Sequence, residues 1–283
     1  MVVDYSGARL AVMMRARFEM TVRVVLLLLL VTAAACATTG SRVPTGTLEP
    51  DKFLFEKGTE ALNEKKWFTA REFFRTLMDS YPQSPHRADA KLGIGDSYLG
   101  DKTAESYVLA INEYREFLAY YPTHDRAHYA QFKLAMAHFQ QMRGPERDQT
   151  ETREAIQEFT VYLQRYPNRE LADEARQRLR EARDRLSEHD YRVGLFYFRS
   201  RMSIPGAIDR FAAVLKNDPE YTHRDAVYYH LAQALLLVEQ PAAALPYLEK
   251  LIAEFEVSEY LERAKVQVAE LKAQVLKKTG GPQ

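Results

Sequence analysis

The residues whose types and spacing could do chemistry are few in this sequence. His124 and His128 stand four residues apart, a spacing at which two imidazoles on one face of a helix can bind the same metal ion. No carboxylate or third histidine stands at a known ligand spacing from them. We therefore interpret the two histidines as part of a polar first helical turn after Pro122, and not as a metal site.

Two other groupings resemble catalytic or binding motifs without completing them. The run 188–190 (Glu-His-Asp) has the composition of an acid–base cluster, but consecutive residues of a helix point about 100° apart and do not converge. The run 93–95 (Gly-Ile-Gly) lacks the third glycine and the preceding strand of a phosphate-binding loop. Neither H-E-x-x-H nor G-x-S-x-G occurs. We expect no catalytic, cofactor-binding or metal site, and a protein that is not an enzyme.

The composition restricts the class of protein further. The chain has 283 residues, of which 46% are hydrophobic and 28% charged, as in globular proteins and unlike disordered or multi-span membrane proteins. Its 39 basic and 39 acidic residues balance, so charge gives no general drive towards nucleic acid, and no nucleic-acid partner is expected. The single cysteine excludes an intramolecular disulfide and a zinc site built from several cysteines.

The first 35 residues have the three-part pattern of a secretory signal peptide. Arg15, Arg17 and Arg23 precede an apolar run at 24–35 that ends in small residues. A bilayer-spanning helix needs ~20 apolar residues, so this run is too short to be a stable anchor. We expect residues 1–35 to be removed.

The only cysteine, Cys36, follows this run directly and resembles the lipid-modified cysteine of bacterial lipoproteins. That resemblance implies attachment of acyl chains at Cys36, and two or more chains hold a protein stably in a membrane. The alternative is an ordinary secreted protein in which the cysteine stands there by chance. Ala37, in place of an aspartate, implies the outer membrane. Residues 36–52 contain many small and polar residues and are expected to form a flexible lipid-attached tether.

The remainder of the chain carries an internal repeat marked by proline. An alanine stands 12 residues before each marker proline and an aromatic residue eight before it. This is the A-x₃-F spacing and helix-ending proline of the tetratricopeptide repeat (TPR). The prolines are Pro82, Pro122, Pro167 and Pro219, the alanines Ala70, Ala110, Ala155 and Ala207, and the aromatic residues Phe74, Tyr114, Phe159 and Phe211.

The repeat predicts an all-α fold, a TPR solenoid of about five helix pairs. A generic helical bundle is the alternative, but it does not require five copies of one spacing. The repeats are expected near 53–82, 88–122, 125–167, 171–219 and 224–257, followed by a capping helix at 259–277 and a tail at 278–283. We also expect a short insertion near 99–107, an exposed loop at 142–153 and a long helix, or two nearly continuous ones, between 171 and 200.

One central segment resembles a known family. A Tyr-Pro-Asn turn at 166–168 precedes a basic helix that reaches Leu186, and an aromatic-rich stretch follows. Together with the lipoprotein signal, the five repeats and the Arg-Asp-Gln run at 147–149, this resembles the BamD family. These are TPR lipoproteins of the outer-membrane β-barrel assembly (BAM) complex. The resemblance covers residues 36–277.

The resemblance implies a scaffold lipoprotein at the periplasmic side of the outer membrane. In the family the N-terminal repeats meet unfolded outer-membrane proteins, which implies substrate contacts within residues 54–121. The C-terminal repeats dock on BamA, and Arg210 matches a family position implicated in that docking. A guanidinium pairs bidentately with a carboxylate, although a solvated helix face is the alternative interpretation of Arg210. The alternative function is that of another TPR lipoprotein or coordinator in pilus biogenesis, cell-wall synthesis or the Tol–Pal system.

Overall fold

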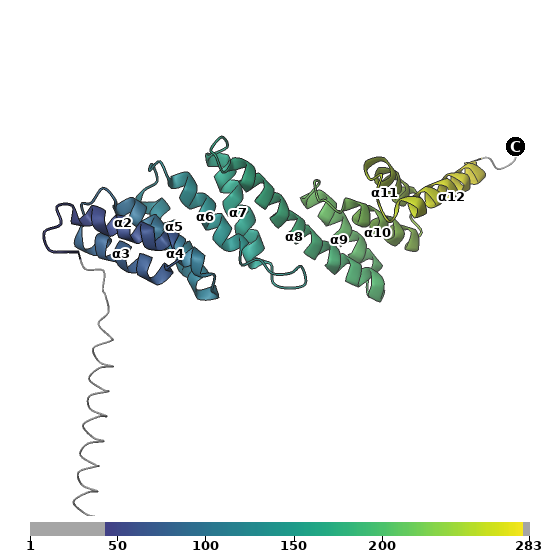
Figure 1. Cartoon of the computed structure of the whole chain (residues 1–283). Helices are drawn as coiled ribbons and strands as arrows, with labels where there is room; N and C mark the ends of the chain where they lie inside the picture. Colours follow the sequence, from purple (N-terminus) through teal and green to yellow (C-terminus); the bar gives the residue numbers. More distant parts are fainter. Residues whose placement is uncertain (1–42, 280–283) are drawn as a thin grey trace, which may run out of the picture.

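The structure, a computed structural model, describes residues 43–279 and the side chains up to residue 274. This part of the chain contains eleven α-helices and no strand, arranged one after another in an elongated array (Figure 1). The helices are α2 (Pro50–Asn63), α3 (Trp67–Ser80), α4 (Arg87–Asp101), α5 (Ala104–Tyr120), α6 (Ala127–Phe139), α7 (Thr150–Arg165), α8 (Ala172–Ser200), α9 (Ile204–Asn217), α10 (Arg224–Leu237), α11 (Pro241–Glu254) and α12 (Leu261–Thr279).

The helices form five successive pairs followed by α12, which confirms the predicted all-α TPR solenoid. Each helix packs on the next along the chain. In addition, each even-numbered helix from α2 to α8 contacts the next even-numbered helix. The even-numbered helices therefore lie side by side and line one side of the solenoid, as the first helices of TPR pairs do.

The repeated alanines and aromatic residues form the core of each pair. All five repeat alanines, including Ala244 of the last pair, are fully buried, and so are the residues four positions later, which are aromatic in the first four pairs and Leu248 in the last. Instead of one central core there are three clusters along the array, within residues 54–137, 132–179 and 191–271. Each cluster is built from neighbouring repeats, because a single pair cannot bury its apolar face.

Small residues of the first helix of a pair make room for the aromatic ring of the second helix. A Cβ atom at Gly58 would lie only 2.6 Å from the ring of Phe74, and Gly93 of the next pair meets the other side of the same ring. Gly95 faces Tyr114 in the same way. Glycine is needed at these positions because a side chain would occupy the space of the ring.

The prolines end the second helix of four pairs. The helices α3, α5, α7 and α9 stop two residues before the proline, and the residue between is the C-cap. Proline cannot continue a helix and disfavours helical geometry in the residue before it. The period seen in the sequence therefore sets the lengths of these helices.

Three segments are expected to interrupt or extend the repeat pattern, and the structure shows a different result for each. The short insertion expected near 99–107 is mostly helical, because α4 continues to Asp101 and α5 begins at Ala104 after a capping box of Thr103 with Ser106. Most of the segment 142–153 is a loop, but α7 already begins at Thr150. The segment between 171 and 200 is the single 29-residue helix α8.

The ends of the array differ slightly from the expected bounds. The helix α2 begins at Pro50, inside the segment 36–52 that is expected to be the tether. Proline fits the first helical turn because its missing N–H has no intrahelical partner there. Within residues 43–279 no helix has the length and apolar character needed to cross a membrane.

Candidate docking surface

The second half of the solenoid is organised by polar side chains on α8. Arg180 donates two hydrogen bonds to the carboxylate of Asp218, one of them over 2.9 Å from Nη1 to Oδ1. The Ser187 hydroxyl donates to the same carboxylate over 2.7 Å. Burial alone would raise the pKa of Asp218, but the hydrogen bonds from Arg180 and Ser187 hold that pKa below its ordinary value. Asp218 is therefore a charged anchor for the turn after α9.

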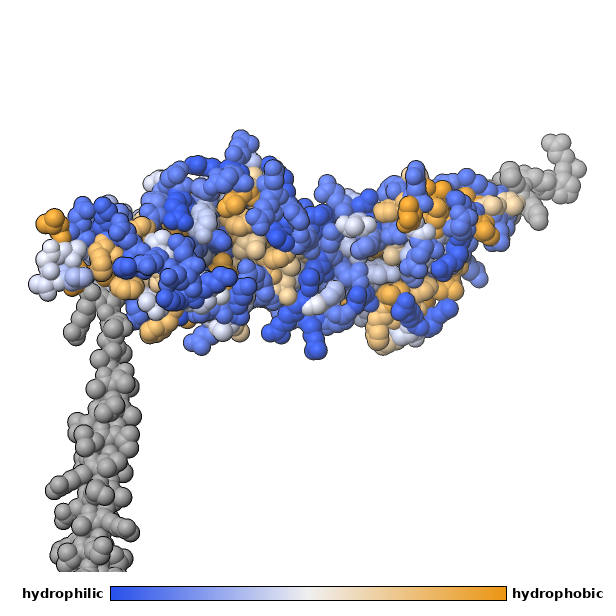
Figure 2. Space-filling view, viewed as in Figure 1, coloured by the Kyte–Doolittle hydropathy of each residue, from blue (hydrophilic) through white to orange (hydrophobic). Residues whose placement is uncertain are grey.

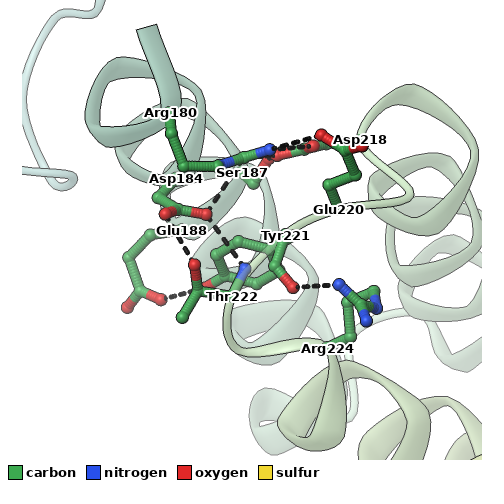
Figure 3. A network of polar contacts seen from close by, with 9 residues as sticks. All are labelled: Arg180, Asp184, Ser187, Glu188, Asp218, Glu220, Tyr221, Thr222 and Arg224. Carbon is green, nitrogen blue, oxygen red and sulfur yellow. Dashed lines mark hydrogen bonds and ion pairs between the residues drawn. The ribbon is translucent and has the colours of Figure 1, made fainter. Parts of the chain in front are cut away.

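Two further carboxylates of α8 hold the same turn. Asp184 accepts hydrogen bonds from the backbone N–H and the hydroxyl of Thr222, over 2.9 and 2.7 Å. Glu188 accepts one from the Tyr221 hydroxyl over 2.5 Å. Figure 3 shows these side chains on one side of α8, facing the turn that leads into α10. The network fixes the position of α10 against α8.

A groove of about 720 Å³ lies beside this network. Its lining comes from α8, the start of α10, the loop before α7 and the residues before α12. Glu181, Asp184, Glu188, Asp225 and Glu259 contribute carboxylates, whereas Arg185 and Arg192 contribute guanidinium groups. The groove therefore has more negative than positive groups. In Figure 2 the surface around α8 and α9 is mainly hydrophilic, with hydrophobic patches over the repeats on either side.

The C-terminal half of α8 continues this surface with a second hollow that includes Leu195, Phe196 and Arg199. Phe196 is an apolar residue of α8 that is 60% exposed. Gly194 faces the core, and a residue two positions further lies about 200° around the helix. That spacing from Gly194 is the signal by which the exposure of Phe196 could have been predicted.

Arg210 lies on α9 next to this part of α8. Its Cβ atom would be 3.2 Å from a Cβ added at Gly194. The side chain is exposed, and it has no hydrogen bond or ion pair with any other residue in the described range. Arg210 therefore presents a free guanidinium group on the exposed side of α9. Arginine is one of the residue types enriched among those that contribute strongly to protein–protein binding.

The histidines and carboxylates that resemble chemical sites have separate contacts. His124 precedes α6, and its ring packs edge-on against Phe117, whereas His128 is buried and contacts Tyr166. In the 188–190 run, Glu188 is bound by Tyr221, while Nδ1 of His189 lies 2.6 Å from the backbone oxygen of Pro145. These groups do not converge on a common point.

The first two repeats carry the region expected to contact substrates. This region contains Asp96 of α4, whose carboxylate accepts hydrogen bonds from Tyr114 over 2.7 Å and from Tyr129 over 3.0 Å. Burial raises the pKa of Asp96 despite these hydrogen bonds. Exposed apolar side chains in this half include Phe68 and Tyr120. The expected lipid-attachment residue, Cys36, lies outside the described residues.

The family model and the named relatives that match this chain all describe outer-membrane proteins. The model of the family "Outer membrane lipoprotein" (YfiO) matches residues 48–237. A relative from Caulobacter vibrioides named "Outer membrane protein assembly factor BamD" is 29% identical, over 79% of this chain and 72% of its own. A protein of the same name from Vibrio cholerae is 26% identical, over 60% of this chain and 73% of its own.

Among solved structures, a tetratricopeptide repeat protein from Parabacteroides merdae aligns with 81% of this chain and 96% of its own, with a TM-score of 0.35 and 14% identity. The family match extends from before α2 to the end of α10 and so includes α8 and α9. The resemblance found in the sequence is thereby confirmed, and the chain belongs to the YfiO family of outer membrane lipoproteins, with relatives named as the assembly factor BamD.

Proposed function

We propose that this chain is a non-enzymatic scaffold of the BAM complex, held by lipid at Cys36 on the periplasmic side of the outer membrane. The observation that carries the proposal is the family match over residues 48–237, which includes the helices from α2 to α10. The names of the relatives support a role in outer-membrane protein assembly. A solenoid of stacked helix pairs suits this role because it offers a long surface on which several partners can bind.

The docking partner in this proposal is a BamA-like protein with repeated periplasmic domains. Arg210 supplies the central contact, because its guanidinium group has no partner among the described residues and can pair bidentately with a carboxylate. The exposed Phe196 of α8 and the exposed Met202 in the turn before α9 add apolar area in the same half of the solenoid. The network around Asp218 supports this surface by fixing the turn after α9, the helix that carries Arg210.

The substrates in this proposal are unfolded segments of outer-membrane proteins, which bind to the first two repeats within residues 54–121. Exposed aromatic side chains such as Phe68 and Tyr120 can contact apolar residues of an extended chain. The substrate surface and the docking surface then lie in different halves of the array (Figure 1).

The proposal is tested by purifying the C-terminally tagged full-length protein from membranes in mild detergent and identifying the proteins that co-purify. We expect a BamA-like barrel protein, and we expect its recovery to fall at least about ten-fold for Arg210→Glu, as for a central interface residue. The control is Arg165→Glu, which reverses the charge of another exposed arginine, at the end of α7.

Two outcomes would contradict parts of this proposal. Recovery of pilus, cell-wall or Tol–Pal components in place of the barrel protein would contradict the BAM role and support the alternative function in one of those systems. An equal loss of the barrel protein from the Arg210→Glu and Arg165→Glu variants would show that Arg210 has no special part in docking.

A further inference from the structure

A cluster of metal-binding side chains lies on α6 and α7, apart from the docking surface. His138 belongs to α6, and Glu154 and Glu158 stand four residues apart on α7. One potential ligand atom of each of these three residues lies within 4.8 Å of those of the other two. His138 is only 4% exposed, so a polar ring is buried at a point where two carboxylates meet.

Two of the three side chains are held in place by further hydrogen bonds. Nδ1 of His138 lies 2.7 Å from Oε2 of Glu151, and since a carboxylate only accepts, Nδ1 carries the proton. The other ring nitrogen, Nε2, is then unprotonated, and its lone pair can bind a metal ion. The buried Gln131 donates to Oε2 of Glu158 over 2.6 Å. Histidine ligands that donate to a carboxylate, and carboxylate ligands that are themselves hydrogen-bonded, are the usual surroundings of protein metal ions.

The charges of the cluster favour an added cation. Within the described residues, the only Lys or Arg group that reaches these carboxylates within 4.0 Å is Arg115 of α5. Arg115 faces the carboxylates of Glu154 and Glu158, and a third carboxylate, that of Glu151, binds the other ring nitrogen of His138, so negative charge remains in excess around the buried ring. Like charges four residues apart on a helix repel each other, and a divalent cation between them removes that repulsion.

Arg115 itself is loosely bound in this position. Its Nη2 atom lies 3.4 Å from Nε2 of His138, 3.8 Å from Glu154 and 4.0 Å from Glu158. Charge-assisted hydrogen bonds between nitrogen and oxygen are normally about 2.7–2.9 Å long. The side chain of Arg115 is half exposed, so its guanidinium group can move into water at little cost. The same point can therefore accept a smaller cation that all three ligands approach more closely.

We propose that His138, Glu154 and Glu158 form a binding site for a divalent transition-metal ion such as Zn²⁺, with Arg115 as a displaceable substitute. One imidazole and two carboxylates are ligands that Zn²⁺ accepts, and three protein ligands leave a fourth position for water. The sequence analysis missed this site because its ligands come from two helices separated by a loop and match no short motif. The site joins α6 to α7 and does not depend on the proposed docking partner.

The test is a calorimetric titration of the detergent-solubilised full-length protein with ZnCl₂ after removal of bound metal with a chelator. We expect one ion per chain, and we expect Glu154→Gln and Glu158→Gln to weaken binding by about ten-fold or more. Glu154 is partly exposed, so its variant tests the site even if a change at the buried His138 prevents folding. Arg115→Gln is expected to tighten binding, because it removes the competing cation.

The matched controls are His124→Gln, outside this cluster, and Glu60→Gln, one of two glutamates four residues apart on α2. Both controls should bind Zn²⁺ as the unchanged protein does. The visible absorption of Co²⁺ added in place of Zn²⁺ should be lost in Glu154→Gln and kept in both controls. Equal Zn²⁺ affinity in the unchanged protein and Glu154→Gln, or an absence of saturable binding, would overturn the proposal. Since co-purification of a barrel protein needs no metal, either proposal can fail without the other.

Discussion

Asp218 differs from the residue at the same position in the first three repeats. The residue before the marker proline is a tyrosine in those copies and an aspartate in the fourth. Its carboxylate is mostly buried and is bound by Arg180 and Ser187 of α8 (Figure 3). A change of one side chain type thus replaces aromatic packing by a charged network at this turn.

We expect Asp218→Asn to lower the free energy of unfolding by roughly 1.5–3 kcal/mol, the usual range for hydrogen bonds to charged groups. The loss arises because Arg180 keeps its charge while its main partner becomes neutral. Chemical denaturation followed by circular dichroism at pH 7 measures the change. The control is Glu220→Gln, which removes an exposed carboxylate 3.8 Å from the same guanidinium. A loss as large in the control as in Asp218→Asn would contradict this account.

The same aspartate gives a pH dependence. The pKa of Asp218 is lowered in the folded protein, so its stabilising effect is present above the unfolded-state pKa of about 3.9 and is lost as the pH falls below that value. The difference in stability between the unchanged protein and Asp218→Asn should therefore be constant near neutral pH and shrink between about pH 5 and pH 3. Denaturation curves at a series of pH values test this, and a difference that grows on acidification would have the wrong sign.

At the scale of elements, the contact between α8 and α9 depends on Gly194. A Cβ atom there would lie 2.8 Å from the ring of Phe211 and 3.2 Å from Cβ of Arg210. The first distance is shorter than carbon atoms tolerate, so α9 would have to move away from α8. Because Arg210 is on α9, the position of the proposed docking residue depends on the absence of a side chain at position 194.

We expect Gly194→Ala to lower the free energy of unfolding by about 1–3 kcal/mol through overpacking, partly offset by about 1 kcal/mol because alanine favours helices. It should also reduce recovery of the proposed barrel partner. Gly144→Ala is the matched control, because its new methyl group would meet only the carboxylate end of Glu146, at 3.1 Å. Thermal unfolding and co-purification of both variants measure the two effects. A more stable Gly194→Ala protein would show that α9 adapts without strain.

At the scale of the whole molecule, the solenoid has no single centre. Its three core clusters follow one another along the array, and each even-numbered helix from α2 to α8 contacts the next even-numbered helix. Distant repeats can therefore carry different partners, while each repeat depends on its neighbours for stability. In our proposal, the segment before the array attaches it to the membrane through Cys36.

We expect Cys36→Ala to move the protein from the membrane to a soluble or signal-retaining periplasmic form, because each buried CH₂ of an acyl chain contributes about 0.8 kcal/mol to membrane binding. Carbonate washing of membranes followed by immunoblotting measures the distribution. Asp218→Asn serves as a control, since it changes the solenoid and leaves position 36 intact. An unchanged membrane fraction of Cys36→Ala after washing would contradict lipid attachment at this residue.

The sequence by itself determined the fold class and the repeat period. Alanine, aromatic residue and proline recur at fixed spacing, and each acts over one or two helical turns, so their effect is local. The central segment and the proline period together also indicated the family, which the match over residues 48–237 confirms. Arg210 and Cys36 came from the resemblance, and both remain proposals.

Only the tertiary structure decided which side chains meet across helices. It brought His138 together with Glu154 and Glu158, and it placed the carboxylates of α8 on the turn after α9. It also made most of the expected insertion near 99–107 helical, with only positions 102–103 between α4 and α5, and it exposed Phe196. Such contacts depend on the angle and rotation of packed helices, which a one-dimensional pattern does not specify, because many registers of two amphipathic helices bury the same apolar residues.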